Sequence, residues 1–168
     1  MYGKQTETAI AAMSRLAEVY DGGVTRLSSS DIAESRGLQR PFVAKILTSL
    51  SQAGLVSGSP GPGGGYTLAR HPKEITVFEV FSLFERENDS DLCPFGGGVC
   101  GVGDPCAIHE KLVRVKDCMD DMLHRTTFDA FRIAFQVEGR RPTSRAEAQV
   151  IAGKARQSFR APRPKRKN

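Results

Sequence analysis

The chain has 168 residues, of which 39% are hydrophobic and 26% are charged, and its formal net charge is +5. This composition supports one ordinary domain with a core and excludes a wholly disordered chain. The longest apolar run is the five residues 9–13, whereas a transmembrane helix needs roughly 20. The first residues lack an apolar signal core, so we expect a cytoplasmic protein with no membrane contact.

The charge is distributed unevenly along the chain. Residues 1–73 hold eight basic and five acidic groups, residues 74–138 hold six and thirteen, and residues 139–168 hold ten and one. The corresponding net charges are +3, −7 and +9. A basic tail can hold a polyanion without sequence preference, or it can be a solvated, disordered segment with no such role.

The first part of the chain predicts a helix-turn-helix. Apolar residues at steps of three and four indicate a helix over residues 4–20. A second helix begins at Ser28, which can form a capping box with Asp31, and stops at Gly37. Pro41 then fits the first turn of a third helix. The buried face of this helix is expected to hold Phe42, Val43, Ile46, Leu47 and Leu50. Two short helices joined by so short a turn are typical of DNA-binding modules.

A β-hairpin is predicted directly after the third helix. Residues 55–57 and 66–69 can form two strands, and seven of the eight residues between them are Gly or Pro. Such a hairpin would be the wing of a winged helix. A phosphate-binding loop is disfavoured, because no Lys-Ser or Lys-Thr follows the glycines to open a helix.

Two helices are expected in the acidic middle of the chain. Thr76 and Glu79 form a second capping box at the start of a short helix that ends near residue 87. A longer helix, over residues 104–125, has apolar residues spaced by four, three, four and three: Ile108, Leu112, Val115, Met119 and Met122. This heptad seam can pack on its own domain, but we favour a homodimer interface, since dimerisation of a small DNA-binding protein increases its affinity for DNA. Cys118, inside this helix, is expected to be a small buried hydrophobe.

A last short helix is expected after Thr126. Thr126 would cap this helix with Asp129 as its partner, and the helix would bury Phe128, Phe131 and Ile133. Beyond residue 139 the hydrophobic pattern fades into the basic tail.

Three of the four cysteines fall in one glycine-rich segment. Their pattern is Cys93-x6-Cys100-x5-Cys106-x2-His109. Three thiolates and an auxiliary ligand suit an iron–sulfur cluster. Zinc takes the same donors, but its sites normally contain a cysteine pair two to four residues apart. The spacing therefore favours a cluster over zinc, and redox thiols or no cofactor are the remaining alternatives.

Several of these features together resemble one known family. The most specific are Gly54-Leu55-Val56 followed by Gly61-Pro62-Gly63-Gly64-Gly65-Tyr66, then residues 75–80, then the three cysteines. Over about residues 1–138 the chain resembles the Rrf2 family of bacterial winged-helix transcription regulators. The resemblance implies a DNA-binding homodimer, with the recognition helix in the major groove, the wing at the minor groove, and a cluster near the long helix that controls binding.

The resemblance also implies cluster ligands. Cys93, Cys100 and Cys106 match the family's cluster cysteines. His109 matches a histidine that ligates a 2Fe–2S cluster in the family's iron–sulfur assembly regulator. Glu7 falls where a nitric-oxide sensor of the family has an Asp that ligates a 4Fe–4S cluster from the partner subunit. We favour His109 and a 2Fe–2S cluster, because His109 is fixed close to Cys106 by local geometry.

The chain departs from the family pattern at three places. Its first cysteine spacing is one residue longer, Pro60 stands where the wing often has an Arg, and Ala44 stands where the assembly regulator has a Glu that reads cytosine. These departures leave DNA binding as the expectation but leave the operator sequence open.

The predicted fold class is mainly α with a small β-hairpin wing, a winged helix-turn-helix plus a long dimerisation helix. Residues 1–73 would form the DNA-binding region, residues 74–138 a helix, the cluster-binding loop (91–109) and the dimerisation helix, and residues 139–168 a basic, disordered tail. The candidate DNA-contacting residues are Ser28, Gln39, Arg40, Lys45, Thr48, Ser49, Gly63, Gly64 and Tyr66.

The predicted function is transcription regulation through a double-stranded DNA operator, under the control of an iron–sulfur cluster. No nucleophile–base pair or pair of catalytic carboxylates stands out, so we expect neither an enzyme nor a small-molecule substrate. The alternatives are a winged-helix regulator with zinc or redox thiols, and a small iron–sulfur carrier.

Overall fold

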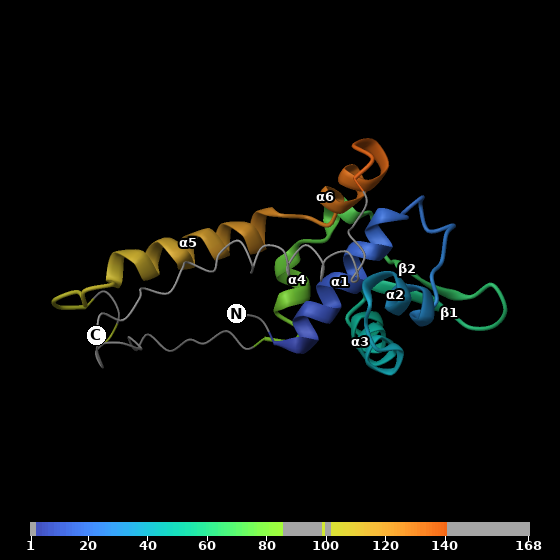
Figure 1. Ribbon diagram of the computed structural model, residues 1–168, viewed down its shortest axis with the longest axis horizontal. Coiled ribbons are helices and arrows are strands. Elements are labelled where there is room, and N and C mark those ends of the chain that lie inside the picture. The colour runs from blue at the N-terminus through green and yellow to red at the C-terminus, as the bar shows by residue number, and fades with distance from the viewer. Residues whose placement is uncertain (1–2, 86–98, 100–101, 141–168) are drawn as a thin grey trace, which may run out of the picture.

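The computed structural model describes residues 3–85, 99 and 102–140. The elements in chain order are α1 (Lys4–Glu18), α2 (Ser29–Arg36), α3 (Arg40–Gln52), β1 (Val56–Ser59), β2 (Gly65–Leu68), the 3-10 helix η1 (Pro72–Glu74), α4 (Val77–Phe81), α5 (His109–Arg125), α6 (Asp129–Arg132) and the π-helix η2 (Ile133–Val137). Helices α1 to α3 and the β1–β2 hairpin gather in one body, and α5 extends away from it (Figure 1). This arrangement confirms the predicted fold class.

Helix α1 lies at the centre of the hydrophobic core. Its buried face carries Ala9, Ala12, Met13, Leu16 and Ala17, all 2% exposed or less. The helix packs against α2, α3, α4 and α6. Because complete burial of a Leu or Met side chain contributes ~1.5–3 kcal/mol, this face is a major source of the stability of the fold.

Local signals at both ends form α2 as predicted. The Asp31 N–H donates to Ser28 Oγ (3.1 Å), and the Ser28 N–H donates to the Asp31 carboxylate (2.8 Å). Gly37 ends the helix in the left-handed conformation, with φ +63°. Only Leu38 and Gln39 then separate Gly37 from the start of α3, whose first turn contains Pro41.

The hairpin pairs β1 with β2 in antiparallel register, from Val56 opposite Leu68 to Ser59 opposite Gly65. A Cβ atom at Gly64 would lie 2.2 Å from the Ser59 carbonyl oxygen, so only glycine fits this turn. Leu27 adds a bridge that the sequence did not predict: its N–H and C=O both bond to Tyr66 (3.0 and 2.8 Å). The wing is therefore tied to the start of α2.

Helix α4 begins with the predicted capping box of Thr76 and Glu79. Burial raises the pKa of Glu79, but hydrogen bonds from Arg70 and from the Thr76 N–H outweigh that effect and hold the pKa below its usual value. The helix ends at Phe81, earlier than expected, and the chain continues in turns over residues 82–84. In these turns the Phe84 and Glu85 N–H groups both donate to the Phe81 carbonyl (3.1 and 3.0 Å).

Helix α5 begins at His109 instead of the predicted residue 104, and residues 102–105 before it are exposed. Its C-terminal end is held on the body: Leu123 is buried, and the His124 ring stacks on Phe78 of α4 at 4.0 Å. Two seam residues are open to solvent in the single chain, Val115 at 60% and Met122 at 40% exposure. The prediction that Cys118 is buried is wrong, since this residue is exposed.

The predicted cap of the last helix is also wrong. Thr126 is extended and ends α5, its carbonyl accepts from the Val77 N–H (2.9 Å), and Phe128 stands at the N-cap of α6. Asp129 instead pairs with Arg132 at 2.6 Å. Phe128 is buried as predicted, Phe131 is half-buried, and Ile133 is 38% exposed.

Candidate functional site

Helix α3 presents a polar face beside a buried one. Val43, Ile46, Leu47 and Leu50 are buried as predicted. Gln39, Arg40, Lys45 and Thr48 are exposed, and Ser49 is partly exposed. The Thr48 and Ser49 hydroxyls donate to the carbonyls four residues earlier (3.0 and 3.4 Å), which leaves their oxygens able to accept from a ligand. The predicted recognition helix therefore exposes two cations and three neutral polar groups.

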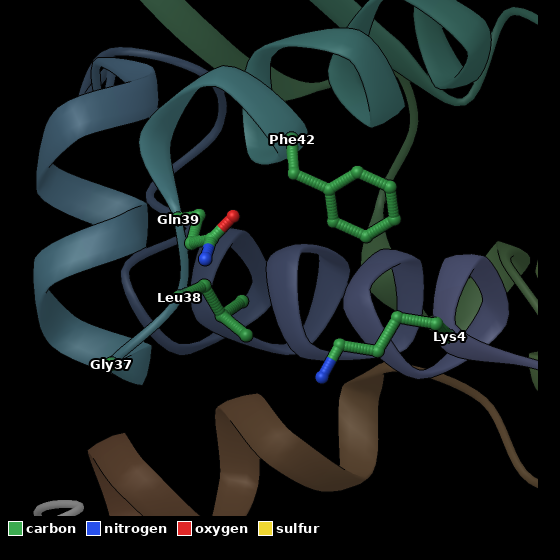
Figure 2. A pocket seen from close by; sticks show the side chains of 5 residues that line it. All are labelled: Lys4, Gly37, Leu38, Gln39 and Phe42. Atoms are coloured by element: carbon green, nitrogen blue, oxygen red, sulfur yellow. The ribbon is translucent and has the colours of Figure 1, made fainter.

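Phe42 is only half-buried, contrary to the prediction. It lines a pocket of about 350 Å³ between α1 and the start of α3, together with Lys4, Gly37, Leu38 and Gln39 (Figure 2). Lys4 of α1 and the residues at the start of α3 thus line one pocket. Sequence periodicity gave no sign of this arrangement.

The remaining candidate residues lie at the wing and at its base. Gly63 is exposed, and Gly64 and Tyr66 are partly exposed. Ser28 is partly exposed, but its hydroxyl already donates to and accepts from Asp31 in the capping box. Arg26, which the sequence analysis did not single out, reaches the Ser57 carbonyl of β1 at 3.5 Å. This places a cation at the base of a wing whose tip lacks an arginine.

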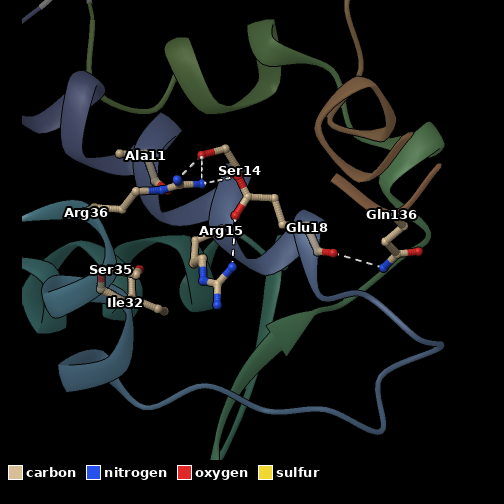
Figure 3. Close-up of polar contacts among 8 residues, drawn as sticks. All are labelled: Ala11, Ser14, Arg15, Glu18, Ile32, Ser35, Arg36 and Gln136. Carbon is tan, nitrogen blue, oxygen red and sulfur yellow. Dashed lines mark hydrogen bonds and ion pairs between the residues drawn. The ribbon is translucent and has the colours of Figure 1, made fainter. Parts of the chain in front are cut away.

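A buried ion-pair network joins α2 to the end of α1 (Figure 3). Glu18 pairs with Arg36 at 2.6 Å and with Arg15 at 3.0 Å, and the Glu18 side chain is only 6% exposed. Arg36 also donates to the Ser14 hydroxyl (3.0 Å) and the Ala11 carbonyl (3.2 Å). Removal of one partner from a buried pair typically costs ~3–5 kcal/mol, so this network holds α2 firmly against α1.

The network extends to the segment after α5. The Gln136 side chain of η2 donates to the carbonyls of Glu18 and Tyr20 (2.9 and 3.0 Å), and the Arg15 guanidinium lies 5.6 Å from the centre of the Phe135 ring. The C-terminal end of α1 is thereby connected to residues that follow the long helix.

The predicted cluster ligands fall partly within the described residues. Cys93 and Cys100 lie outside them. Cys106 is half-buried, and its carbonyl accepts from the N–H of His109 at 3.0 Å, in the turn that leads into α5. This backbone hydrogen bond keeps Cys106 and His109 within one turn of each other. A thiol and an imidazole are both donors that an iron–sulfur site can use. Residues 3–85, 99 and 102–140 contain no group of three His, Cys, Asp or Glu side chains placed to hold a metal ion.

The two candidates for the fourth ligand occupy different places. His109 is the first residue of α5 and lies directly beside Cys106. Glu7 is exposed in the first turn of α1. The starts of α1 and α5 lie well apart in the single chain (Figure 1). Of these two candidates, His109 is the one that neighbours Cys106 in the single chain.

Comparison with known proteins agrees with this geometry. Residues 2–131 match the Rrf2 family, described as an iron-dependent transcriptional regulator. The chain is 33% identical over 119 residues to the HTH-type transcriptional regulator IscR of Escherichia coli, which covers 71% of this chain and 72% of that protein. It is 32% identical over 99 residues to an HTH-type transcriptional regulator of Aquifex aeolicus, which covers 58% of this chain and 69% of that protein.

Solved structures show the same fold. The IscR structure from T. potens has a TM-score of 0.61 and 25% identity, and covers 86% of this chain and 93% of its own. The structure of CymR, the global cysteine regulator of B. subtilis, has a TM-score of 0.59 and 24% identity, and covers 79% of this chain and 95% of its own.

Fold and sequence thus define a DNA-binding transcription regulator of the winged helix-turn-helix class and not an enzyme. The match over residues 2–131 assigns it within this class: the chain belongs to the Rrf2 family. None of the helices in the described part of the chain is long and apolar enough to cross a membrane.

Proposed function

We propose that this regulator binds its operator as a homodimer and that an iron–sulfur cluster on the cysteine segment (residues 91–109) controls the binding. The observation that carries the proposal is the backbone turn that places Cys106 and His109 three residues apart at the start of α5, in a chain whose first part is a winged helix. The similarity to IscR and the family's description as iron-dependent support it.

Each part of the chain has a distinct role in this proposal. The thiolates of Cys93, Cys100 and Cys106 and the imidazole of His109 would hold the cluster. When bound, the cluster supplies a redox-sensitive, visibly coloured centre. The first residues of α3 would contact base edges, since the N-terminal residues of a recognition helix do so in helix-turn-helix proteins. Arg26 would add a phosphate contact at the base of the wing.

The homodimer follows from the seam of α5. In the single chain, Val115 and Met122 are exposed, and Leu112 and Met119 are half-buried. Apolar residues at heptad spacing pack most favourably against a second helix. Two copies would then present two winged helices to the two halves of an operator.

The cluster is tested by anaerobic reconstitution with iron and sulfide. We expect the wild-type chain to absorb visible light and to hold about two irons and two sulfides per chain, as a 2Fe–2S cluster requires. Cys106→Ala should lose the colour, because no other soft anionic ligand lies at that place. The matched control is Cys118→Ala, which removes an exposed cysteine of α5. A colourless wild-type protein that binds zinc or no metal would contradict the proposal.

The same measurement distinguishes the candidates for the fourth ligand. We expect His109→Ala to destabilise the cluster and Glu7→Ala to leave it unchanged, since His109 is the neighbour of Cys106 within one chain. Cluster loss in Glu7→Ala alone, with about four irons per wild-type chain, would instead assign a 4Fe–4S cluster ligated from α1.

A further inference from the structure

The start of α1 is held by a carboxylate from a distant part of the chain. The Gly3 N–H donates to Glu85 Oε1 at 2.6 Å, and the Thr6 hydroxyl donates to the same oxygen. Glu85 lies 82 residues after Gly3 in sequence, and the cysteine segment follows it a few residues later. The chain is therefore attached to the first turn of α1 just before it enters that segment.

The Glu85 carboxylate acts at the N-cap of α1, where it accepts from the N–H of Gly3, as the N3 side chain does in a capping box. Gly3 stands at the N-cap position and has no side chain to bind the free N–H groups of the first turn. A carboxylate is favoured near the positive end of a helix. These contacts also favour the charged carboxylate: the hydrogen bonds from the Thr6 hydroxyl and the Gly3 N–H hold the pKa of Glu85 below its ordinary value.

The residues around Glu85 favour its contact with the start of α1. Thr6 is completely buried, so its hydroxyl has few other partners than Glu85. A Cβ atom at Gly3 would lie 3.0 Å from Glu85 Oε1, so a side chain there would crowd the carboxylate. Both the buried hydroxyl and the small residue allow Glu85 to approach the helix closely.

The other end of α1 carries the network of Glu18 with Arg36 of α2. Helix α1 is thus bound at its first turn to Glu85, a few residues before the cysteine segment, and at its last turn to Arg36 of α2. It also packs along α3. A displacement of Glu85 would therefore act on α1, which contacts both α2 and α3.

We propose that Glu85 is a positioning residue that caps α1 from a distance and couples the cysteine segment to the DNA-binding helices. The inference rests on the proposed function, because the coupling has meaning only where the cluster changes DNA binding. Glu85 itself is assigned no role as a cluster ligand.

Glu85→Gln in the full-length chain tests the proposal, because it removes the charge and keeps the size. Glu74→Gln, which removes another exposed carboxylate, is the control. In the cluster-free state, we expect amide hydrogen exchange of Gly3 and of residues 7–9 to accelerate about tenfold in Glu85→Gln only. An amide oxygen accepts from the Gly3 N–H and the Thr6 hydroxyl more weakly than a carboxylate does, so the helix end opens more often. After reconstitution, the iron content of Glu85→Gln should equal that of the wild-type protein.

The second readout is the ratio of DNA affinities between the cluster-loaded and the cluster-free protein. The probe is a duplex selected by the wild-type protein from a random-sequence library. We expect this ratio to be at least about fivefold in wild type and to fall to within about twofold of one in Glu85→Gln. Thr6→Val, which removes the donor but keeps the shape, and Gly3→Ala, which crowds the carboxylate, should lower the ratio in the same direction.

The outcomes test the proposed function and the inference about Glu85 separately. A wild-type ratio of one would contradict the proposed function. A clear wild-type ratio that Glu85→Gln leaves unchanged, together with unchanged exchange of Gly3 and of residues 7–9, would overturn the inference alone. If Glu85→Gln does not fold, Thr6→Val decides by the same two readouts.

Discussion

The double variant Arg40→Ala/Lys45→Ala is expected to lose at least about 30-fold in affinity for the selected duplex, because each contact to a base edge contributes ~1–3 kcal/mol. Both side chains are exposed on α3, whereas Val43 and Ile46 of the same helix are buried. Where one of them contacts a phosphate instead, the slope of log affinity against log salt should fall by about one. Fluorescence anisotropy at several salt concentrations measures both effects.

The matched control is Lys73→Ala/Arg125→Ala, which removes the same charge from exposed positions outside α3. This control should change affinity only through the net charge of the chain. If Arg40→Ala/Lys45→Ala bound the duplex as tightly as wild type at matched salt, α3 would not be the recognition helix.

The variant Leu112→Glu/Met119→Glu should convert the homodimer to a monomer. Both residues lie on the seam of α5, where carboxylates in a packed interface would be strongly unfavourable. Loss of the dimer should also abolish tight binding to a duplex with two half-sites, because each monomer would bind one half alone. Sedimentation velocity at micromolar concentration measures the association state.

Arg114→Glu is the control for this variant, since Arg114 is exposed on α5 away from the seam. It should remain a dimer. Wild-type protein that sediments as a monomer at the same concentration would contradict the assignment of the seam.

The parts of the fold that depend on local chemistry were predictable from sequence. The capping boxes at Ser28 and Thr76 and the left-handed stop at Gly37 each act within four residues, and all three are present. The wing follows from the glycines of its turn, because Gly64 has no room for a side chain. Such signals need no knowledge of the rest of the molecule.

The errors arose where distant segments decide the local structure. Thr126 followed by Asp129 matches the sequence pattern of a helix N-cap. The chain is extended there instead, because the Thr126 carbonyl accepts from the Val77 N–H and Thr76 forms a β-bridge with Thr127. Position 118 looks internal by its place next to the seam, yet in the single chain no segment of the described part covers it. The approach of Glu85 to Gly3 joins residues 82 positions apart, which no periodicity reveals.

The residues of the candidate site also fall into those that sequence periodicity predicts and those that depend on tertiary packing. The exposed face of α3 follows from helical periodicity, so Arg40 and Lys45 could be named before the structure was known. Arg26 and Lys4 could not, because their proximity to the wing and to α3 results from tertiary packing. The turn between Cys106 and His109 was expected inside a helix, but it precedes α5.

The central claim, that a cluster controls operator binding, is tested most directly by one titration. The wild-type protein is divided into a reconstituted and a cluster-free portion, and each is titrated anaerobically onto the selected duplex at the same salt concentration. The account predicts that the two dissociation constants differ by at least about fivefold, as allosteric coupling normally requires. Equal dissociation constants for a cluster-loaded and a cluster-free protein would contradict it.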